Sequence, residues 1–91
     1  MLMFKREVVI ANKLGLHARA ATKLATLAAT FDASVTLEQG DKSASASSIL
    51  GLLMLESGMG KTISVIAEGD DAQAALDAVC QLIEDKFEEG A

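Results

Sequence analysis

The chain has 91 residues with 13 acidic and eight basic side chains, a net charge of −5 and one cysteine. This length allows a single domain, residues 1–91, and one cysteine excludes an internal disulfide. The acidic balance and the small number of aromatic residues, three, argue against nucleic acid as a partner. No apolar run reaches the ~18 residues of a membrane-spanning helix, so we expect a cytoplasmic monomer without membrane insertion.

The first two predicted elements meet at the only histidine of the chain, His17. Residues 3–11 contain three consecutive β-branched residues and predict a strand whose apolar side chains alternate with a period of two. Residues 18–31 place apolar side chains at three-and-four spacing, which predicts a helix with one buried stripe. The turn between them contains Gly15, which permits a tight or left-handed backbone just before the histidine.

The middle of the chain predicts a hairpin and a short apolar helix. Residues 34–38 and 42–46 are predicted strands joined by a Gln-Gly-Asp turn. Ser47 or Ser48 can cap a helix that runs through Leu55. This helix is apolar nearly all round, so either part of its surface is exposed for a partner or the helix is fully buried.

A fourth strand and a last helix complete the pattern. Residues 62–68 alternate as a strand, and residues 72–87 have helical apolar spacing after a Gly-Asp-Asp turn that supplies the N-cap. We expect the acidic tail beyond this helix to be frayed. The order βαββαβα favours an α+β fold in which the helices are segregated to one face of a sheet.

The position of His17 suggests a phosphohistidine site. A helix that begins just after it leaves several backbone N–H groups without intrahelical partners, and these groups favour an anion. A phosphoryl group on His17 would be held by the amides around Ala18 and Ala20, while Arg19 supplies a charged hydrogen-bonding fork. The alternative is a packed or surface histidine without a chemical role.

Charge is distributed unevenly along the chain. Residues 1–31 carry five basic and one acidic side chain, a net of +4, whereas residues 68–91 carry eight acidic and one basic side chain, a net of −7. The histidine therefore lies in the basic part of an acidic chain. This asymmetry can steer an acidic partner or a phosphoryl donor towards one face. The alternative is that the basic side chains only keep the surface solvated.

The segment Gly15-Leu16-His17-Ala18-Arg19 resembles the active-site signature of HPr, the histidine-containing phosphocarrier family of the bacterial phosphoenolpyruvate:sugar phosphotransferase system. Residues 42–52 and 63–71 are similar to two further parts of the family pattern, in the same order. The resemblance implies an HPr-like open-faced β-sandwich with a four-stranded antiparallel sheet and three helices on one face. One departure is Ala20, because the family usually has proline there, and this change affects the preorganisation of the helix start.

The resemblance also implies the chemistry and the partners. Phosphorylated enzyme I would donate a phosphoryl group to Nδ1 of His17, Arg19 would stabilise the transferred charge, and an EIIA-type domain would receive the group. Such a protein is a phosphoryl carrier rather than a self-contained enzyme, and it needs no metal or cofactor. The predicted rim for partner binding comprises Leu16, Ala20, Lys23, Ile49, Leu50 and Leu53.

Ser48 is a second candidate site. Its position resembles that of the family's regulatory serine, which an HPr kinase/phosphorylase phosphorylates in some bacteria. A phosphate there would place negative charge beside the docking rim and weaken partner binding. The alternative is that Ser48 serves only as a helix cap.

Two further interpretations stay open. One is membership of the nitrogen-related branch of the family, whose phosphorelay regulates rather than transports sugar. Residues 12–15 and 52–57 resemble that branch, whereas residues 42–46 look more like the sugar branch. The other is a non-catalytic interaction module in which His17 is incidental and the short apolar helix binds a partner. A phosphoryl adduct that depends on His17 would separate the carrier from the module.

Overall fold

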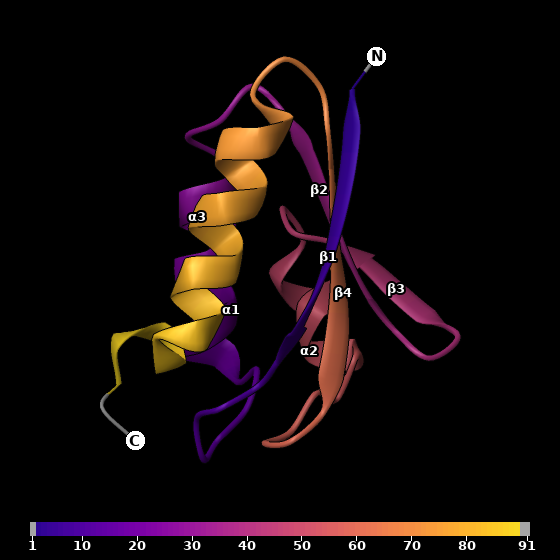
Figure 1. Cartoon of the computed structure of the whole chain (residues 1–91). Helices are drawn as coiled ribbons and strands as arrows, with labels where there is room; N and C mark the ends of the chain where they lie inside the picture. The colour runs from indigo at the N-terminus through magenta and orange to yellow at the C-terminus, as the bar shows by residue number, and fades with distance from the viewer. Residues whose placement is uncertain (1, 90–91) are drawn as a thin grey trace.

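The computed structural model describes residues 2–89 and shows a sheet with helices packed against it (Figure 1). In chain order the elements are β1 Met3–Val9, α1 Ala18–Ala28, β2 Ser34–Gln39, β3 Lys42–Ser45, α2 Ile49–Met54, β4 Thr62–Glu68, α3 Ala72–Glu84 and the 3₁₀ turn η1 Lys86–Glu88. The four strands lie in the order β1-β4-β2-β3, and neighbouring strands are antiparallel. The helices α1, α2 and α3 share one face of the sheet (Figure 1), which confirms the predicted α+β open-faced sandwich.

The core lies between this sheet and the helices. β4 is an inner strand of the sheet, and its alternate residues Ile63, Val65 and Ala67 are fully buried. β1 is an edge strand, which explains how Arg6 fits a position that breaks the apolar alternation. The guanidinium of Arg6 reaches the carboxylate of Asp77 on α3 at 2.7 Å.

The two longer helices each bury one stripe, as their spacing predicts. On α1 the buried side chains are Ala20, Ala21, Leu24 and Ala28. α3 buries Cys80 completely, and this burial raises the pKa of its thiol. Cys80 is therefore the small buried apolar residue that its position in the helix suggests.

The short helix α2 is exposed along much of its length. Leu52 is fully buried, whereas Leu50 and Met54 are 71% and 67% exposed. The alternative of a fully buried helix is therefore wrong. Ser48 occupies the N-cap, and its hydroxyl oxygen accepts a hydrogen bond from the amide of Gly51 at 3.1 Å.

Three predicted helix ends differ from the structure, and that of α2 differs by a single residue, Met54 instead of Leu55. α1 ends at Ala28 rather than at residue 31, and α3 ends at Glu84 rather than at residue 87. Asp71 occupies the N-cap position of α3, but its carboxylate accepts a hydrogen bond from the amide of Asp32 at 2.8 Å instead of capping the helix. The start of α3 is thereby tied to the segment that follows α1.

The chain reverses direction after α3. The residues of η1, Lys86, Phe87 and Glu88, have left-handed φ values of 56°, 53° and 65°. This conformation is unfavourable for residues other than glycine, and the complete burial of the Phe87 ring offsets its cost. The prediction of a frayed tail is therefore wrong as far as Glu89, while residues 90 and 91 lie outside the described residues.

No helix within residues 2–89 combines the length and the apolar character needed to cross a membrane.

Candidate functional site

The loop between β1 and α1 is fixed in place by its contact with the segment that follows α2. Gly15 has a left-handed φ of +65°, and a Cβ atom there would lie 2.7 Å from Cα of Gly58 and even closer to the carbonyl oxygen of Ser57. The amide of Leu16 donates a hydrogen bond to that carbonyl oxygen at 2.8 Å. The backbone that leads into the histidine is therefore held by steric fit and by a hydrogen bond.

His17 occupies the N-cap position of α1, as predicted. Its backbone is extended, with φ −86° and ψ −178°, and its ring makes no capping hydrogen bond to the helix. Among residues 2–89, no hydrogen-bond acceptor engages the amides of Ala18, Arg19 and Ala20. The first turn of α1 can therefore donate these hydrogen bonds to a bound anion.

The imidazole of His17 is partly buried, and one of its two nitrogens is engaged. The side chain is 25% exposed, and Nε2 is bonded to the carboxylate of Glu89. Asn12, which is fully buried, donates from Nδ2 to the other carboxylate oxygen of Glu89 at 3.0 Å and to the carbonyl oxygen of Gly15 at 2.8 Å. Nδ1 is left without a partner among residues 2–89.

Two opposing effects set the pKa of Glu89. Burial raises the pKa of this carboxyl group, but the hydrogen bonds from His17 and Asn12 and the nearby charge of Lys23 lower it further than burial raises it. The pKa of Glu89 therefore lies below its usual value, and the group is a carboxylate at neutral pH.

Arg19 lies beside the histidine and is exposed. Its side chain lines the same pocket as those of Lys13, Leu14, His17 and Glu89. No carboxylate within residues 2–89 forms an ion pair with Arg19. Its guanidinium is thus available to an anionic group at the histidine.

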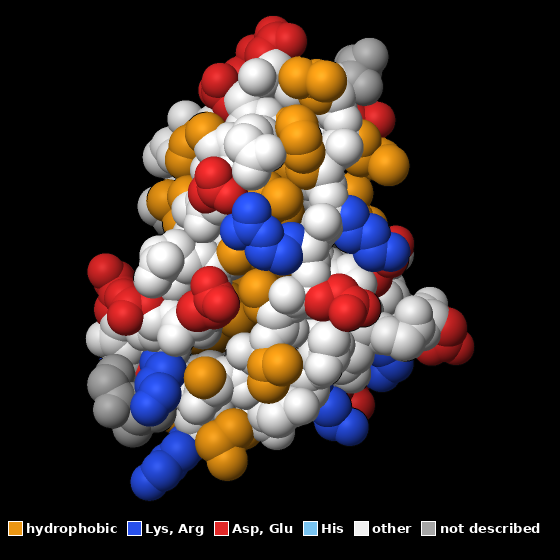
Figure 2. All heavy atoms as spheres, viewed as in Figure 1, with side chains coloured by type: hydrophobic (Ala, Val, Ile, Leu, Met, Phe, Trp, Pro, Cys, Tyr) orange, Lys and Arg blue, Asp and Glu red, His pale blue; other side chains and the backbone are white. Residues whose placement is uncertain are grey.

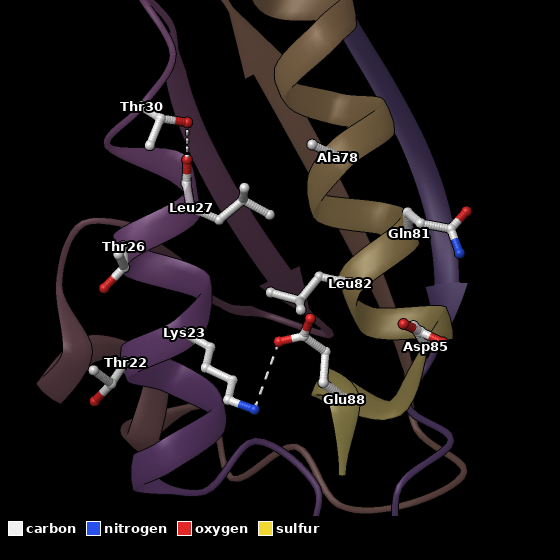
Figure 3. A pocket seen from close by; sticks show the side chains of 10 residues that line it. All are labelled: Thr22, Lys23, Thr26, Leu27, Thr30, Ala78, Gln81, Leu82, Asp85 and Glu88. Atoms are coloured by element: carbon white, nitrogen blue, oxygen red, sulfur yellow. Dashed lines mark hydrogen bonds and ion pairs between the residues drawn. The ribbon is translucent and has the colours of Figure 1, made fainter. Parts of the chain in front are cut away.

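Lys23 makes two contacts with the tail that follows α3. Its ammonium donates a hydrogen bond to the carbonyl oxygen of Phe87 at 2.8 Å and lies 3.7 Å from the carboxylate of Glu88 (Figure 3). These contacts cross one end of a groove between α1 and α3, to which Leu27 and Leu82 contribute apolar walls (Figure 3). Lys23 therefore ties α1 to the tail, and its contact with a partner stays a prediction.

The predicted partner rim needs a second correction. Leu16 is 5% exposed and Ala20 is fully buried, because both side chains pack into the core behind the histidine. Their side chains are therefore not available to a partner. Ile49 and Leu50 are exposed as predicted, and Leu53 is partly buried.

Folding removes much of the charge asymmetry seen along the chain. Residues of the acidic C-terminal part reach basic or histidine side chains of the N-terminal part, in the pairs Arg6–Asp77, Lys23–Glu88 and His17–Glu89. On the face shown in Figure 2, basic and acidic side chains are interspersed, and no extended patch of one sign is visible there. Glu89 of the acidic tail is bonded to the histidine, and the basic residues Lys13 and Arg19 line the same pocket.

Comparison with known proteins identifies the family. A family model described as "PTS HPr component phosphorylation site" matches residues 4–85. The chain belongs to the HPr family of phosphocarrier proteins of the phosphotransferase system. The fold of the chain agrees with solved HPr structures.

The chain matches a crystal structure of HPr from Thermoanaerobacter tengcongensis with a TM-score of 0.90 and 37% identity, covering 94% of this chain and 97% of that chain. It matches HPr from Bacillus anthracis with a TM-score of 0.87 and 34% identity, covering 91% and 99%.

Relatives from both branches of the HPr family are similar in sequence. The phosphocarrier protein NPr of Shewanella violacea is 63% identical over 91 residues, covering 100% of both chains. NPr of Escherichia coli is 45% identical over 86 residues, covering 93% of this chain and 96% of the relative. The phosphocarrier protein HPr of Cupriavidus necator is 43% identical over 88 residues, covering 97% and 99%.

Four residues of the site and of the exposed apolar surface were not among the predicted site residues, namely Glu89, Asn12, Leu14 and Met54. Glu89 and Asn12 were overlooked because the contacts of Glu89 with His17 and with Asn12 span 72 and 77 positions of the chain. Leu14, which lines the pocket of His17, and Met54 on α2 are 72% and 67% exposed, and neither was included in the predicted rim. Their positions in a turn and at the end of an apolar helix were the available signals.

Within residues 2–89, no three His, Cys, Asp or Glu side chains are clustered so that they could hold a metal ion.

Proposed function

We propose that His17 accepts a phosphoryl group on Nδ1 from phosphorylated enzyme I and passes it to an EIIA-type acceptor. The observation that carries this proposal is the position of the imidazole at the N-terminus of α1. Nε2 is engaged by Glu89, Nδ1 has no partner among residues 2–89, and the amides of the first helical turn lack acceptors within the same range. Membership of the HPr family supports the same assignment.

The chemistry needs no further group on this chain. The lone pair of Nδ1 forms a bond to phosphorus while the bond between phosphorus and the donor group of enzyme I breaks. In the second step the acceptor forms a bond to phosphorus, and the N–P bond breaks with its electrons returning to Nδ1 of His17. The guanidinium of Arg19, exposed beside the ring, stabilises the charge on the transferring oxygens.

Docking of both partners is assigned to the exposed apolar side chains of α2 and of the loop before His17. Leu50 and Met54 of α2 are 71% and 67% exposed, and Leu14 in the loop before His17 is 72% exposed. Exposed apolar clusters of this kind are typical of sites that bind other proteins. Enzyme I and the acceptor would use this surface in turn, with the carrier acting as a monomer.

The similarity to named relatives favours the nitrogen-related branch. The identity to NPr of Shewanella violacea is 63%, against 43% to HPr of Cupriavidus necator, over nearly the same length. The natural acceptor would then belong to a regulatory phosphorelay rather than to sugar transport. Phosphotransfer to a nitrogen-type EIIA domain should be faster than transfer to a sugar-type EIIA domain, and the reverse order would contradict this assignment.

Ser48 is proposed as a second, regulatory phosphorylation site. The side chain is exposed and stands directly before Ile49 and Leu50 at the docking surface. A phosphate there would add negative charge beside apolar contacts and weaken the binding of both partners. An HPr kinase/phosphorylase should therefore label Ser48, and Ser48→Asp should slow transfer from enzyme I.

The deciding experiment is labelling with phosphoenolpyruvate and enzyme I. The carrier should gain a phosphoryl group that is lost in acid and retained in base, and His17→Ala should abolish it while Ser48→Ala retains it. A folded protein that stays unlabelled would contradict the proposal and favour a non-catalytic interaction module.

A further inference from the structure

The tail after α3 is built so that one carboxylate meets the histidine. Phe87 is fully buried, and its carbonyl oxygen accepts a hydrogen bond from the ammonium of Lys23. The same ammonium faces the carboxylate of Glu88 (Figure 3). The next residues continue the reversal, with the amide of Glu89 donating a hydrogen bond to the carbonyl oxygen of Lys86 at 3.0 Å. In Figure 1 the tail turns back at the end of the molecule where α1 begins. Glu89 is therefore placed by a fixed backbone rather than by a loose end.

The carboxylate of Glu89 is also oriented at both oxygens. Nε2 of His17 bonds to one oxygen, and Nδ2 of Asn12 donates to the other at 3.0 Å. Asn12 is itself fixed, since it is fully buried and also donates to the carbonyl oxygen of Gly15. The arrangement resembles the carboxylate–histidine pairs that select one tautomer of the ring elsewhere in proteins.

We infer that Glu89 is a positioning residue that keeps the proton of His17 on Nε2 and thereby makes Nδ1 the nitrogen that accepts the phosphoryl group. This inference rests on the proposed function and adds the residue that determines which ring nitrogen reacts. An ionised carboxylate only accepts hydrogen bonds, so the nitrogen that faces it must carry the proton. A neutral ring has one such proton, and the lone pair is then on Nδ1.

The carboxylate also protects Nε2 from modification. A phosphoryl group on Nε2 would have to displace the hydrogen bond and would bring its negative charge against that of Glu89. The positive groups nearby do not reproduce this selection. Lys13 and Arg19 line the pocket and attract an anion without distinguishing the two nitrogens, and Lys23 is bound to the tail. Of these charged groups, only Glu89 is bonded to the ring.

Glu89 has a second effect once His17 is phosphorylated. With phosphorus on Nδ1 and a proton on Nε2, the ring carries a positive charge, which the carboxylate stabilises. When the acceptor attacks phosphorus, the N–P bond breaks and the ring leaves as a neutral imidazole that still carries its proton on Nε2. Glu89 thus keeps the phosphorylated ring in the form from which the phosphoryl group leaves readily.

A small phosphoryl donor tests this inference without enzyme I. Phosphoramidate transfers its phosphoryl group to imidazole as its own P–N bond breaks and ammonia leaves, and alkaline hydrolysis then releases the two phosphohistidine isomers for separation. The wild-type chain should yield the Nδ1 isomer. Glu89→Ala should raise the share of the Nε2 isomer about tenfold, because a charge-assisted hydrogen bond no longer has to break. Glu89→Gln should give an intermediate share, since the amide oxygen still accepts a hydrogen bond.

Glu88→Ala is the matched control, because it removes the same charge from the neighbouring residue, whose carboxylate is 66% exposed and faces Lys23. It should leave the isomer ratio as in the wild type. The ¹⁵N spectrum of the unmodified protein gives a second measurement, in which the ring proton should reside on Nε2. An unchanged isomer ratio in Glu89→Ala, or a wild-type ring protonated on Nδ1, would overturn the inference.

The ¹⁵N spectrum tests whether Glu89 keeps the proton on Nε2 even where phosphoramidate modifies neither nitrogen. A failure of labelling by enzyme I would instead contradict the proposed function and leave the isomer ratio and the spectrum standing.

Discussion

The amide of Leu16 and the carbonyl oxygen of Ser57 are joined by a hydrogen bond of 2.8 Å that holds the loop before α1 against the segment before β4. Gly15 lies at the point of closest approach, where a side chain would overlap the backbone of Ser57 and Gly58. The position of His17 therefore depends on a contact between two segments that are about forty residues apart in the chain. A glycine at position 15 is a steric requirement of that contact.

Gly15→Ala should destabilise the domain and displace the histidine. The substitution combines a left-handed φ of +65° with overlap against the backbone, and we expect the free energy of unfolding to fall by about 2–4 kcal/mol. Gly40→Ala is the matched control, since Gly40 has a φ of +61° but no atom within 4 Å of the added Cβ. Its loss should be only about 1 kcal/mol. Urea denaturation measures the free energy of unfolding of both variants. Equal losses would show that the close contact with Ser57 does not add to the cost of the substitution.

Arg19→Ala should slow phosphotransfer from enzyme I without unfolding the domain. The side chain is exposed and has no ion pair within residues 2–89, so its removal leaves the packing unchanged. Loss of one charged donor to the transferring oxygens should lower the rate by about one to two orders of magnitude. Rapid-quench kinetics measures the rate. Lys5→Ala, which removes a charge from the exposed surface of β1, is the control, and equal rates in both variants would contradict the role of Arg19.

Lys23→Met should release the tail from α1. The ammonium of Lys23 bonds to the carbonyl oxygen of Phe87 at 2.8 Å, and its loss should cost about 1 kcal/mol and speed hydrogen exchange at residues 87–89. The phosphoramidate adduct should then shift partly towards Nε2, because Glu89 is held less firmly. Lys61→Met, at an exposed lysine that has no ion pair within residues 2–89, should change neither quantity. Unchanged exchange in Lys23→Met would mean that the buried Phe87 ring alone holds the tail.

Much of the fold and the start of the site could be predicted because the signals are local. The spacing of apolar residues located α1, α3 and most of the strands, β3 followed from the hairpin turn before it, and the helix start after His17 followed from a turn glycine and an alanine-rich run. Ser48 was recognisable as a cap from its place before a short apolar helix. The strand order came from resemblance to a family, since alternation within a strand does not specify its neighbours.

The surroundings of the histidine could not be predicted because they are assembled by the tertiary fold. The helical spacing of apolar residues continues through Phe87, but α3 ends at Glu84. The Phe87 ring is buried because the chain reverses direction in η1. Glu89 then meets His17 across 72 positions. Leu16 and Ala20 looked like rim residues because they lie close to the histidine in sequence, yet both side chains pack into the core, and Ala20 belongs to the buried stripe of α1.

The carboxylate of Glu89 should make stability depend on pH in the acid range. Its pKa is lower in the folded chain than its usual value, so the unfolded chain binds a proton at a pH where the folded chain does not. The stabilisation is fully present above the unfolded glutamate pKa of about 4.3 and is lost as the pH falls through the lower folded pKa. Wild type should therefore exceed Glu89→Gln by about 1–2 kcal/mol in unfolding free energy at pH 7, and the difference should shrink below about pH 4.

Urea denaturation across this range measures the difference. Glu88→Gln removes a carboxylate that is 66% exposed and should differ little from wild type throughout. A Glu89→Gln difference that stayed constant down to about pH 2 would show that the bonds from His17 and Asn12 do not hold the carboxylate in solution.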